Sequence, residues 1–187
     1  MSKGIFTTEK IATSGMLIAL SIVVNVFGIP ITPSNQITFV HTISAISGIT
    51  LGPIFGFIIG FLGSCIGFFI NPNGAYNMLF DISAGLSGVI FGLAFTVYRK
   101  FIKNKSVIKL TVTFIIAFIV VTTVCTAGIN TVACYRLYSS KTNSFFVYLF
   151  ARLPFQLLVS LINCILSITI ILTLNKVRLF NKLFSIE

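Results

Sequence analysis

Residues 54–70 read IFGFIIGFLGSCIGFFI, an apolar run without a charged residue, and NPNG follows at residues 71–74. A helix needs ~20 predominantly apolar residues to cross a bilayer, and Asn-Pro-Asn-Gly is a strong turn signal. The stretch therefore predicts a membrane-spanning helix that stops at a tight turn. The rest of the chain has the same character: of 187 residues, 56% are hydrophobic and 9% are charged, against roughly 25% charged in soluble domains.

Five further apolar runs flank this one, and together they predict an all-α integral membrane protein. Its single domain, residues 1–187, is a compact bundle of six transmembrane helices. The helices are expected at about residues 11–29, 36–51, 54–70, 75–98, 108–135 and 145–174. The first should end at Pro30 and Pro33, because proline cannot continue the helical hydrogen-bond ladder. Six such helices use most of the chain and leave room only for short loops.

The basic residues predict the orientation of this bundle. A net charge of +10 would suggest nucleic acid in a soluble protein, but here the cations flank apolar helices. Three of them fall on one side of the bundle, at Arg136, Lys141 and Arg152. The other ten share a side with both termini: Lys3, Lys10, Arg99, Lys100, Lys103, Lys105, Lys109, Lys176, Arg178 and Lys182. The positive-inside rule then puts both termini in the cytoplasm of a bacterial cell.

Small residues recur four positions apart along several predicted helices. Gly48, Gly52, Gly56 and Gly60 form the longest series, and Gly15 and Ala19 form a similar pair on the first helix. Residues at this spacing share one helix face and let helix backbones approach closely in lipid. Packing within the bundle is one interpretation of such a face, and a docking surface for another membrane protein is the other.

Sequence motifs of an enzyme are missing. The chain has no G-x-x-x-x-G-K-[ST] nucleotide cradle, no H-E-x-x-H and a single histidine, His41, which excludes a zinc hydrolase. Its four cysteines form no C-x-x-C pair, so neither a metal site nor a disulfide framework is indicated. One carboxylate, Asp81, falls within a predicted span, whereas general acid–base catalysis usually requires a second ionisable group beside it. We expect a protein without cofactor, metal or catalytic residue.

Polar residues gather instead near the predicted outer side, as expected of a binding site. They are Gln36, Asn71, Asn73, Tyr76, Asn77, Asn130, Arg136, Lys141, Arg152 and Gln156. Arg152 and Gln156 stand four apart on one helix face, and Pro154 between them frees a backbone carbonyl. A fixed guanidinium beside an amide suits a ligand with a carboxylate and a polar ring. The alternative for Arg152 is snorkelling to the outer interface.

Two ionisable residues within predicted spans have a functional and a structural interpretation. Charge at membrane depth is costly, which makes Asp81 a candidate for the site. It could equally serve hydrogen bonding within the bundle or pairing with a cation. His41 is a candidate ligand contact, although a lone helical histidine is more often a hydrogen-bonded packing residue.

Several motifs resemble one transporter family. Leu51-Gly52-Pro53-Ile54-Phe55-Gly56, Asn71-Pro72-Asn73-Gly74-Ala75-Tyr76 and Ser87-Gly88-Val89-Ile90-Phe91-Gly92 resemble the substrate-binding S components of energy-coupling-factor (ECF) transporters. Ile129-Asn130-Thr131 and Arg152-x-Pro154-x-Gln156 are similar to motifs of the folate-specific branch. The resemblance covers most of the chain, from about Gly15 to Gln156.

This resemblance implies a six-helix protein that binds a vitamin in an outward-facing cavity. It also implies partners: a transmembrane coupling subunit and two cytoplasmic ATPase subunits, with small residues of the first helix, here Gly15 and Ala19, at the docking face. The sequence departs from the family at Gln36, where a basic residue is frequent, and at Asp81, where an uncharged residue is typical.

Folate is the vitamin that the residues favour. It carries two carboxylates, which the outer cations could attract, and a flat pterin whose edge amide side chains could bind. Thiamine, a cation, should want acidic outer residues. Another anionic vitamin such as pantothenate, or a membrane scaffold without ligand, stays open as an alternative.

Overall fold

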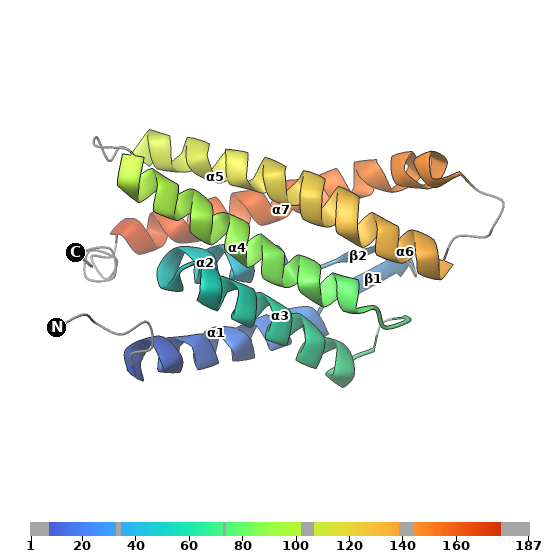
Figure 1. The fold of residues 1–187 in the computed structure, drawn as a ribbon, viewed down its shortest axis with the longest axis horizontal. Coiled ribbons are helices and arrows are strands. Elements are labelled where there is room, and N and C mark those ends of the chain that lie inside the picture. Colours follow the sequence, from blue (N-terminus) through green and yellow to red (C-terminus); the bar gives the residue numbers. More distant parts are fainter. Residues whose placement is uncertain (1–7, 33–34, 73, 102–106, 139–143, 177–187) are drawn as a thin grey trace.

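The fold is a bundle of helices with a short β-hairpin at one end, as seen in a computed structural model (Figure 1). The structure describes residues 8–32, 35–72, 74–101, 107–138 and 144–176. The chain runs through α1 (Thr8–Val26), β1 (Ile29–Thr32), β2 (Asn35–Ile37), α2 (Val40–Leu51), α3 (Pro53–Ile70), α4 (Met78–Phe101), α5 (Val107–Val121), the π-helical segment η1 (Thr122–Asn130), α6 (Thr131–Tyr138) and α7 (Phe145–Lys176).

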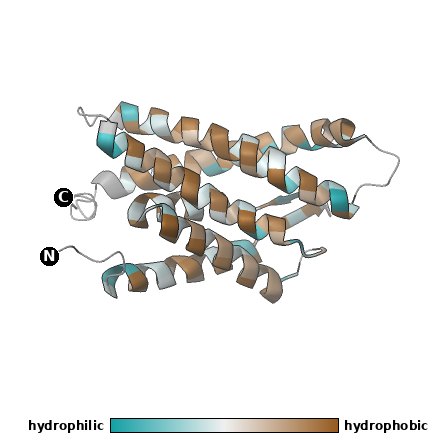
Figure 2. Ribbon diagram, in the orientation of Figure 1, coloured by the Kyte–Doolittle hydropathy of each residue, from teal (hydrophilic) through white to brown (hydrophobic). Residues whose placement is uncertain are grey.

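Five stretches of helix are long and apolar enough to cross a membrane: Thr8–Val26, Pro53–Ile70, Met78–Lys100, Ile108–Tyr138 and Phe145–Thr173. Figure 2 shows hydrophobic residues along their length and hydrophilic ones gathered toward the ends. The second predicted span is shorter. With 12 residues, α2 is about 18 Å long, well below the ~30 Å of a bilayer core.

The expected start of this second helix at Gln36 is wrong. Gln36 lies in β2, which pairs antiparallel with β1 through Ile29–Ile37, Pro30–Gln36 and Thr32–Asn35, and the helix begins only at Val40. Pro30 ends helical continuity, and the β-branched residues Ile29, Ile31, Thr32 and Ile37 suit extended backbone. The two strands have no further neighbour among the described residues, so Pro30 needs no ladder hydrogen bond there.

The other helix ends lie close to their predicted positions. α1 ends at Val26, three residues before the expected end, and α4 begins at Met78 rather than Ala75. α5, η1 and α6 follow one another without a gap, which gives the single long helix expected at 108–135. Only Gly52 separates α2 from α3, and its φ of +95° lies in the left-handed region that favours glycine.

Glycines hold α2, α3 and α4 together at close range. A Cβ on Gly48 or on Gly60 would collide with a backbone carbonyl of α4, and one on Gly88 would collide with the carbonyl of Gly56. Gly63 and Gly67 meet side chains of α1 in the same way. These small residues therefore pack inside the bundle.

Gly15 behaves differently from the packed glycines. A Cβ at this position would have nothing within 4 Å, and both Gly15 and Ala19 are exposed on α1. The pair thus belongs to a surface of the bundle.

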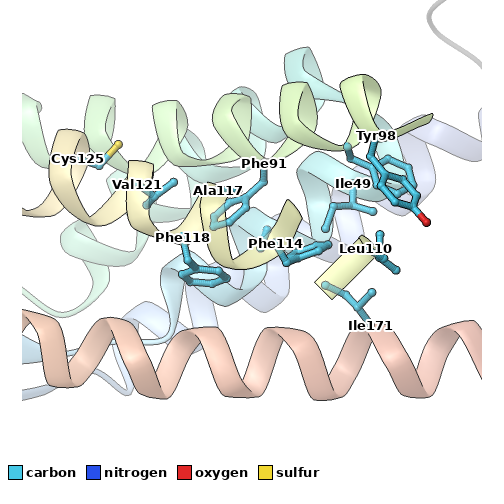
Figure 3. Close-up of a cluster of buried hydrophobic side chains, with 12 residues drawn as sticks. Ile49, Phe91, Tyr98, Leu110, Phe114, Ala117, Phe118, Val121, Cys125 and Ile171 are labelled. Carbon is cyan, nitrogen blue, oxygen red and sulfur yellow. The ribbon is translucent and has the colours of Figure 1, made fainter. Parts of the chain in front are cut away.

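An aromatic core lies between α4, α5 and α7. Phe91, Phe114 and Phe118 are buried in it, and the rings of Phe91 and Phe118 have centroids 4.7 Å apart (Figure 3). A second cluster of Ile43, Leu51, Phe55 and Ile59 joins α2 and α3 to α1. The aromatic core lies toward the end of the bundle away from the hairpin, because it includes Tyr98 near the end of α4 and Leu110 near the start of α5 (Figure 1). Together the two cores hold helices whose other ends line the cavity described next.

Candidate functional site

A cavity of about 560 Å³ opens at the hairpin end of the bundle. This end is opposite the first residues of α1 and the last turn of α7 (Figure 1). The lining comes from the hairpin, the α3–α4 connection, the η1–α6 junction and one face of α7, together with neighbouring ends of α1, α2 and α4. Ligand pockets typically measure about 300–1,000 Å³, so the cavity has room for a vitamin-sized molecule.

Eight of the ten sequence-predicted site residues line this cavity. They are Gln36, His41, Asn71, Tyr76, Asp81, Asn130, Arg152 and Gln156. Arg136 is exposed on α6 and is not among the lining residues. Asn73 and the expected outer cation Lys141 lie outside the described residues.

Arg152 is the arginine of the described cavity wall, and it connects three elements. Its side chain is only 7% exposed. Its Nε donates to Asn35 Oδ1 of the hairpin at 3.1 Å, and its Nη1 donates to the carbonyl of Asn130 at 3.3 Å. The guanidinium carbon also lies 5.8 Å from the centre of the Tyr148 ring. A guanidinium has five N–H donors, so Arg152 can keep these contacts and still donate to a ligand.

Three polar atoms of the cavity lining are buried without a hydrogen-bond partner in the described part of the chain. They are Gln156 Oε1, Asn130 Oδ1 and His41 Nδ1. Gln156 donates through its other amide atom, Nε2, to Thr131 Oγ1 at 3.4 Å, and this contact holds the side chain in place. Each unsatisfied buried polar group costs about 1–3 kcal/mol. A ligand that supplies hydrogen-bond donors would remove this cost.

Asp81 supplies the carboxylate of the cavity from the first turn of α4. It is 2% exposed and accepts hydrogen bonds from Ser64 Oγ at 2.6 Å and from the Tyr76 hydroxyl at 2.8 Å. The bond to Asp81 is the main reason why the pKa of Tyr76 is raised above its ordinary value of 10.0. Tyr76 therefore stays protonated and remains a donor to the carboxylate.

Further hydrogen bonds fix the rim of the cavity. Asn71 Nδ2 donates to the carbonyl of Val26 at 2.8 Å, which ties the end of α3 to the end of α1. The backbone N–H of Ala75 donates to the Tyr138 hydroxyl at 2.9 Å and ties the α3–α4 connection to α6. Asn71 thus has a structural role at the rim as well as a place in the lining.

Sequence reasoning missed three residues that build the site: Asn35, Ser64 and Tyr138. Ser64 is a lone polar residue in the apolar run of α3, and that position was a usable signal. Asn35 lies one residue before the helix predicted from Gln36, so no predicted element fixes the position of its side chain. Tyr138 precedes a polar loop and has no local signature, since only the fold brings it to the α3–α4 connection.

The described lining of the cavity offers hydrogen-bonding groups. Its polar side chains are amides and hydroxyls, with one guanidinium, one imidazole, one carboxylate and the thiol of Cys134. Among the described residues, no three His, Cys, Asp or Glu side chains gather as the ligands of a metal ion would.

Comparison with known proteins gives one family. The family model described as "ECF transporter, substrate-specific component" matches residues 9–171. A UPF0397 protein of Streptococcus gordonii is 29% identical over 89 residues, which are 47% of each protein. A UPF0397 protein of Streptococcus pneumoniae (strain CGSP14) is 28% identical over 99 residues, which are 52% of each. The matched region thus spans about half the length of these curated relatives.

Two solved structures share the fold. The crystal structure of FolT bound with folic acid has a TM-score of 0.64 and 20% identity, and the match covers 87% of this chain and 92% of that one. The S component of a bacterial ECF transporter has a TM-score of 0.59 and 20% identity, with 90% and 96% covered. At this identity, the likeness concerns the fold alone.

Proposed function

Because this chain belongs to the family of substrate-specific components of ECF transporters, we propose that it captures folate in the cavity at the hairpin end. A substrate-specific component is a binding subunit of a transporter and not an enzyme. Its task is to bind one substrate and release it unchanged, which agrees with a lining of amides, hydroxyls and single charges.

The observation that carries the proposal is the set of unpartnered buried atoms on residues that line the cavity together with Arg152. Gln156 Oε1, Asn130 Oδ1 and His41 Nδ1 can each accept a hydrogen bond, and no described residue provides one. The amino and amide N–H groups between the pterin and the glutamate tail of folate are donors that would fit them. Arg152 can hold a carboxylate of the glutamate tail by charge-assisted hydrogen bonds. Phe68, Phe80 and Phe155, which also line the cavity, offer rings for stacking on a flat heterocycle.

The unpartnered atoms also bear on the scaffold alternative. A scaffold without ligand would require that the polar groups satisfy one another, and three of them do not. Pantothenate would satisfy Arg152, but it has no flat ring edge. Folate is therefore the better fit to the lining as a whole.

The proposal includes an orientation in the bacterial cell membrane. The cavity would open outward, with the start of α1 and the end of α4 in the cytoplasm. Among the residues whose side chains are described, Lys10, Arg99, Lys100 and Lys109 lie on that cytoplasmic side of the helices, whereas Arg136 and Arg152 lie on the cavity side. This asymmetry follows the positive-inside rule.

Folate binding by the purified protein in detergent tests the proposal. Calorimetric titration should give a dissociation constant below about 1 μM, and Arg152→Gln should weaken it at least about tenfold, because a charge-assisted contact is lost. Arg136→Gln is the matched control: this arginine is exposed outside the cavity, and the variant should bind within about twofold of the parent.

Two results would contradict this assignment. A dissociation constant no better than micromolar for the parent protein would reject folate, and tight binding of pantothenate at the same site would replace it. Equal affinity of the parent and Arg152→Gln would return Arg152 to a purely structural role between the hairpin, η1 and α7.

A further inference from the structure

Asp81 is a buried carboxylate that has no cationic partner in the described part of the chain. It lines the same cavity as Arg152 but forms no ion pair with it or with any other described residue. An ionised carboxylate is costly to bury unless it is paired or well hydrogen-bonded. Two hydroxyl donors and the N-terminal end of α4 offset part of that cost. A cavity-facing ligand group can offset the remainder.

The hydrogen bonds that Asp81 makes leave each of its two carboxylate oxygens able to accept one more. Ser64 donates to Oδ1 and Tyr76 donates to Oδ2. A carboxylate oxygen can accept two hydrogen bonds, so each oxygen keeps one site. Two acceptor sites on one carboxylate match two parallel N–H donors of a planar group. A ring N–H next to an exocyclic amino group, as in a 2-aminopyrimidin-4-one, presents such a pair.

We propose that Asp81 determines the specificity of the cavity by binding this two-donor edge of the ligand ring. The inference rests on the proposed function and deepens it, because a pterin carries the 2-aminopyrimidin-4-one edge. It makes the preferred substrate a molecule with two unlike ends: an acidic tail for Arg152 and an amidine-like ring edge for Asp81. An acid without such an edge, pantothenate among them, is then a poor ligand.

A pair of ligands that differ in one donor tests the inference. Folate and 2-desaminofolate, which lacks the exocyclic amino group, are titrated against the parent protein and against Asp81→Asn. The parent should prefer folate at least about tenfold, because loss of a donor leaves a buried charge unsatisfied. In Asp81→Asn, folate should weaken to within about threefold of the analogue, since an amide matches the two-donor edge at one atom only.

Glu9→Gln is the matched control for this substitution. Glu9 is also an acidic residue in the first turn of a helix, but it is exposed on α1 and lies outside the cavity. This variant should keep the full preference for folate. An equal loss of affinity for both ligands in Asp81→Asn would show a structural role and overturn the inference, as would equal affinity of the parent for both ligands.

The affinities of the parent for folate and for 2-desaminofolate can be compared without any variant. The inference therefore stays testable even where Asp81→Asn fails to fold. If the parent binds no folate, the proposed function is rejected, but the role of Asp81 can still be tested with the ring fragment alone. At millimolar concentration, 2-aminopyrimidin-4-one should raise the melting temperature of the parent more than pyrimidin-4-one does. The same rise with both fragments would overturn the inference.

Discussion

At the scale of single residues, the cavity combines two charges of opposite sign that do not neutralise each other. Arg152 is held by the hairpin and η1, and Asp81 is held by Ser64 and Tyr76. Each is over nine-tenths buried, so each has been fixed by neighbours of its own rather than by the opposite charge. Two separate, pre-oriented charges favour a ligand that has two different polar ends.

The hydroxyl of Tyr76 provides a pH-dependent test of this arrangement. Its hydrogen bond to Asp81 raises the pKa of Tyr76 above 10.0, so the folded-state pKa exceeds the unfolded one. The bond therefore stabilises the fold fully below pH 10 and loses that contribution as the pH rises further. The difference between the ultraviolet pH titrations of the parent and of Tyr76→Phe should show one phenol that ionises above pH 10. In Asp81→Asn the same phenol should ionise at lower pH, and an unchanged midpoint would contradict the bond.

At the scale of secondary-structure elements, the sequence predicted most of the helices because lipid imposes long apolar runs. The ends of α3 and the spacing of Arg152 and Gln156 on α7 followed directly from composition and helical periodicity. The hairpin did not, since two strands as short as Ile29–Thr32 and Asn35–Ile37 carry no alternation that stands out beside apolar helices. Contacts such as Ala75 to Tyr138 depend on how distant elements meet, which periodicity cannot reveal.

The glycine interface of α2, α3 and α4 predicts unequal effects of the same substitution. Gly88→Ala would push a methyl group into the carbonyl of Gly56 and should destabilise the protein by about 1–3 kcal/mol through overpacking. Gly15→Ala has open space around it and should be neutral or stabilising by up to about 1 kcal/mol, because alanine favours helix. Thermal melting in detergent would compare the two, and equal melting temperatures would refute the close approach at Gly88.

At the scale of the whole molecule, the cavity and the exposed pair on α1 lie in different parts of the structure. Substrate-specific components pair with an ECF module, and the resemblance described above implies that this module consists of a coupling subunit and two ATPase subunits. Gly15 and Ala19 are both exposed on α1, and a Cβ added at Gly15 would have no neighbouring atom within 4 Å in the described structure. We propose that this face docks the transmembrane coupling subunit that the family resemblance implies, which would separate binding of the substrate from its transport.

Gly15→Leu tests that separation. A bulky side chain on the exposed face should leave folate affinity within about twofold of the parent, because α1 contributes only its far end to the cavity. Co-purification with the coupling subunit and uptake of labelled folate into cells should both fall severalfold, since close helix approach needs small residues. Leu20→Phe, a change at an exposed hydrophobic position of the same helix, serves as the comparison. Normal uptake by Gly15→Leu would move docking to another surface.

The contacts of Arg152 also determine when, during synthesis, the binding site comes into existence. Its partner Asn35 precedes it by 117 residues, and Asn163 of the same helix bonds back to Thr38 across 125 residues. Contacts between such distant segments form late, after the intervening chain has been ordered. The ribosome must release α7, and α7 must pack beside the hairpin, before Arg152 becomes part of the cavity wall. Ligand binding by nascent chains would therefore report complete assembly of the bundle rather than insertion of its first helices.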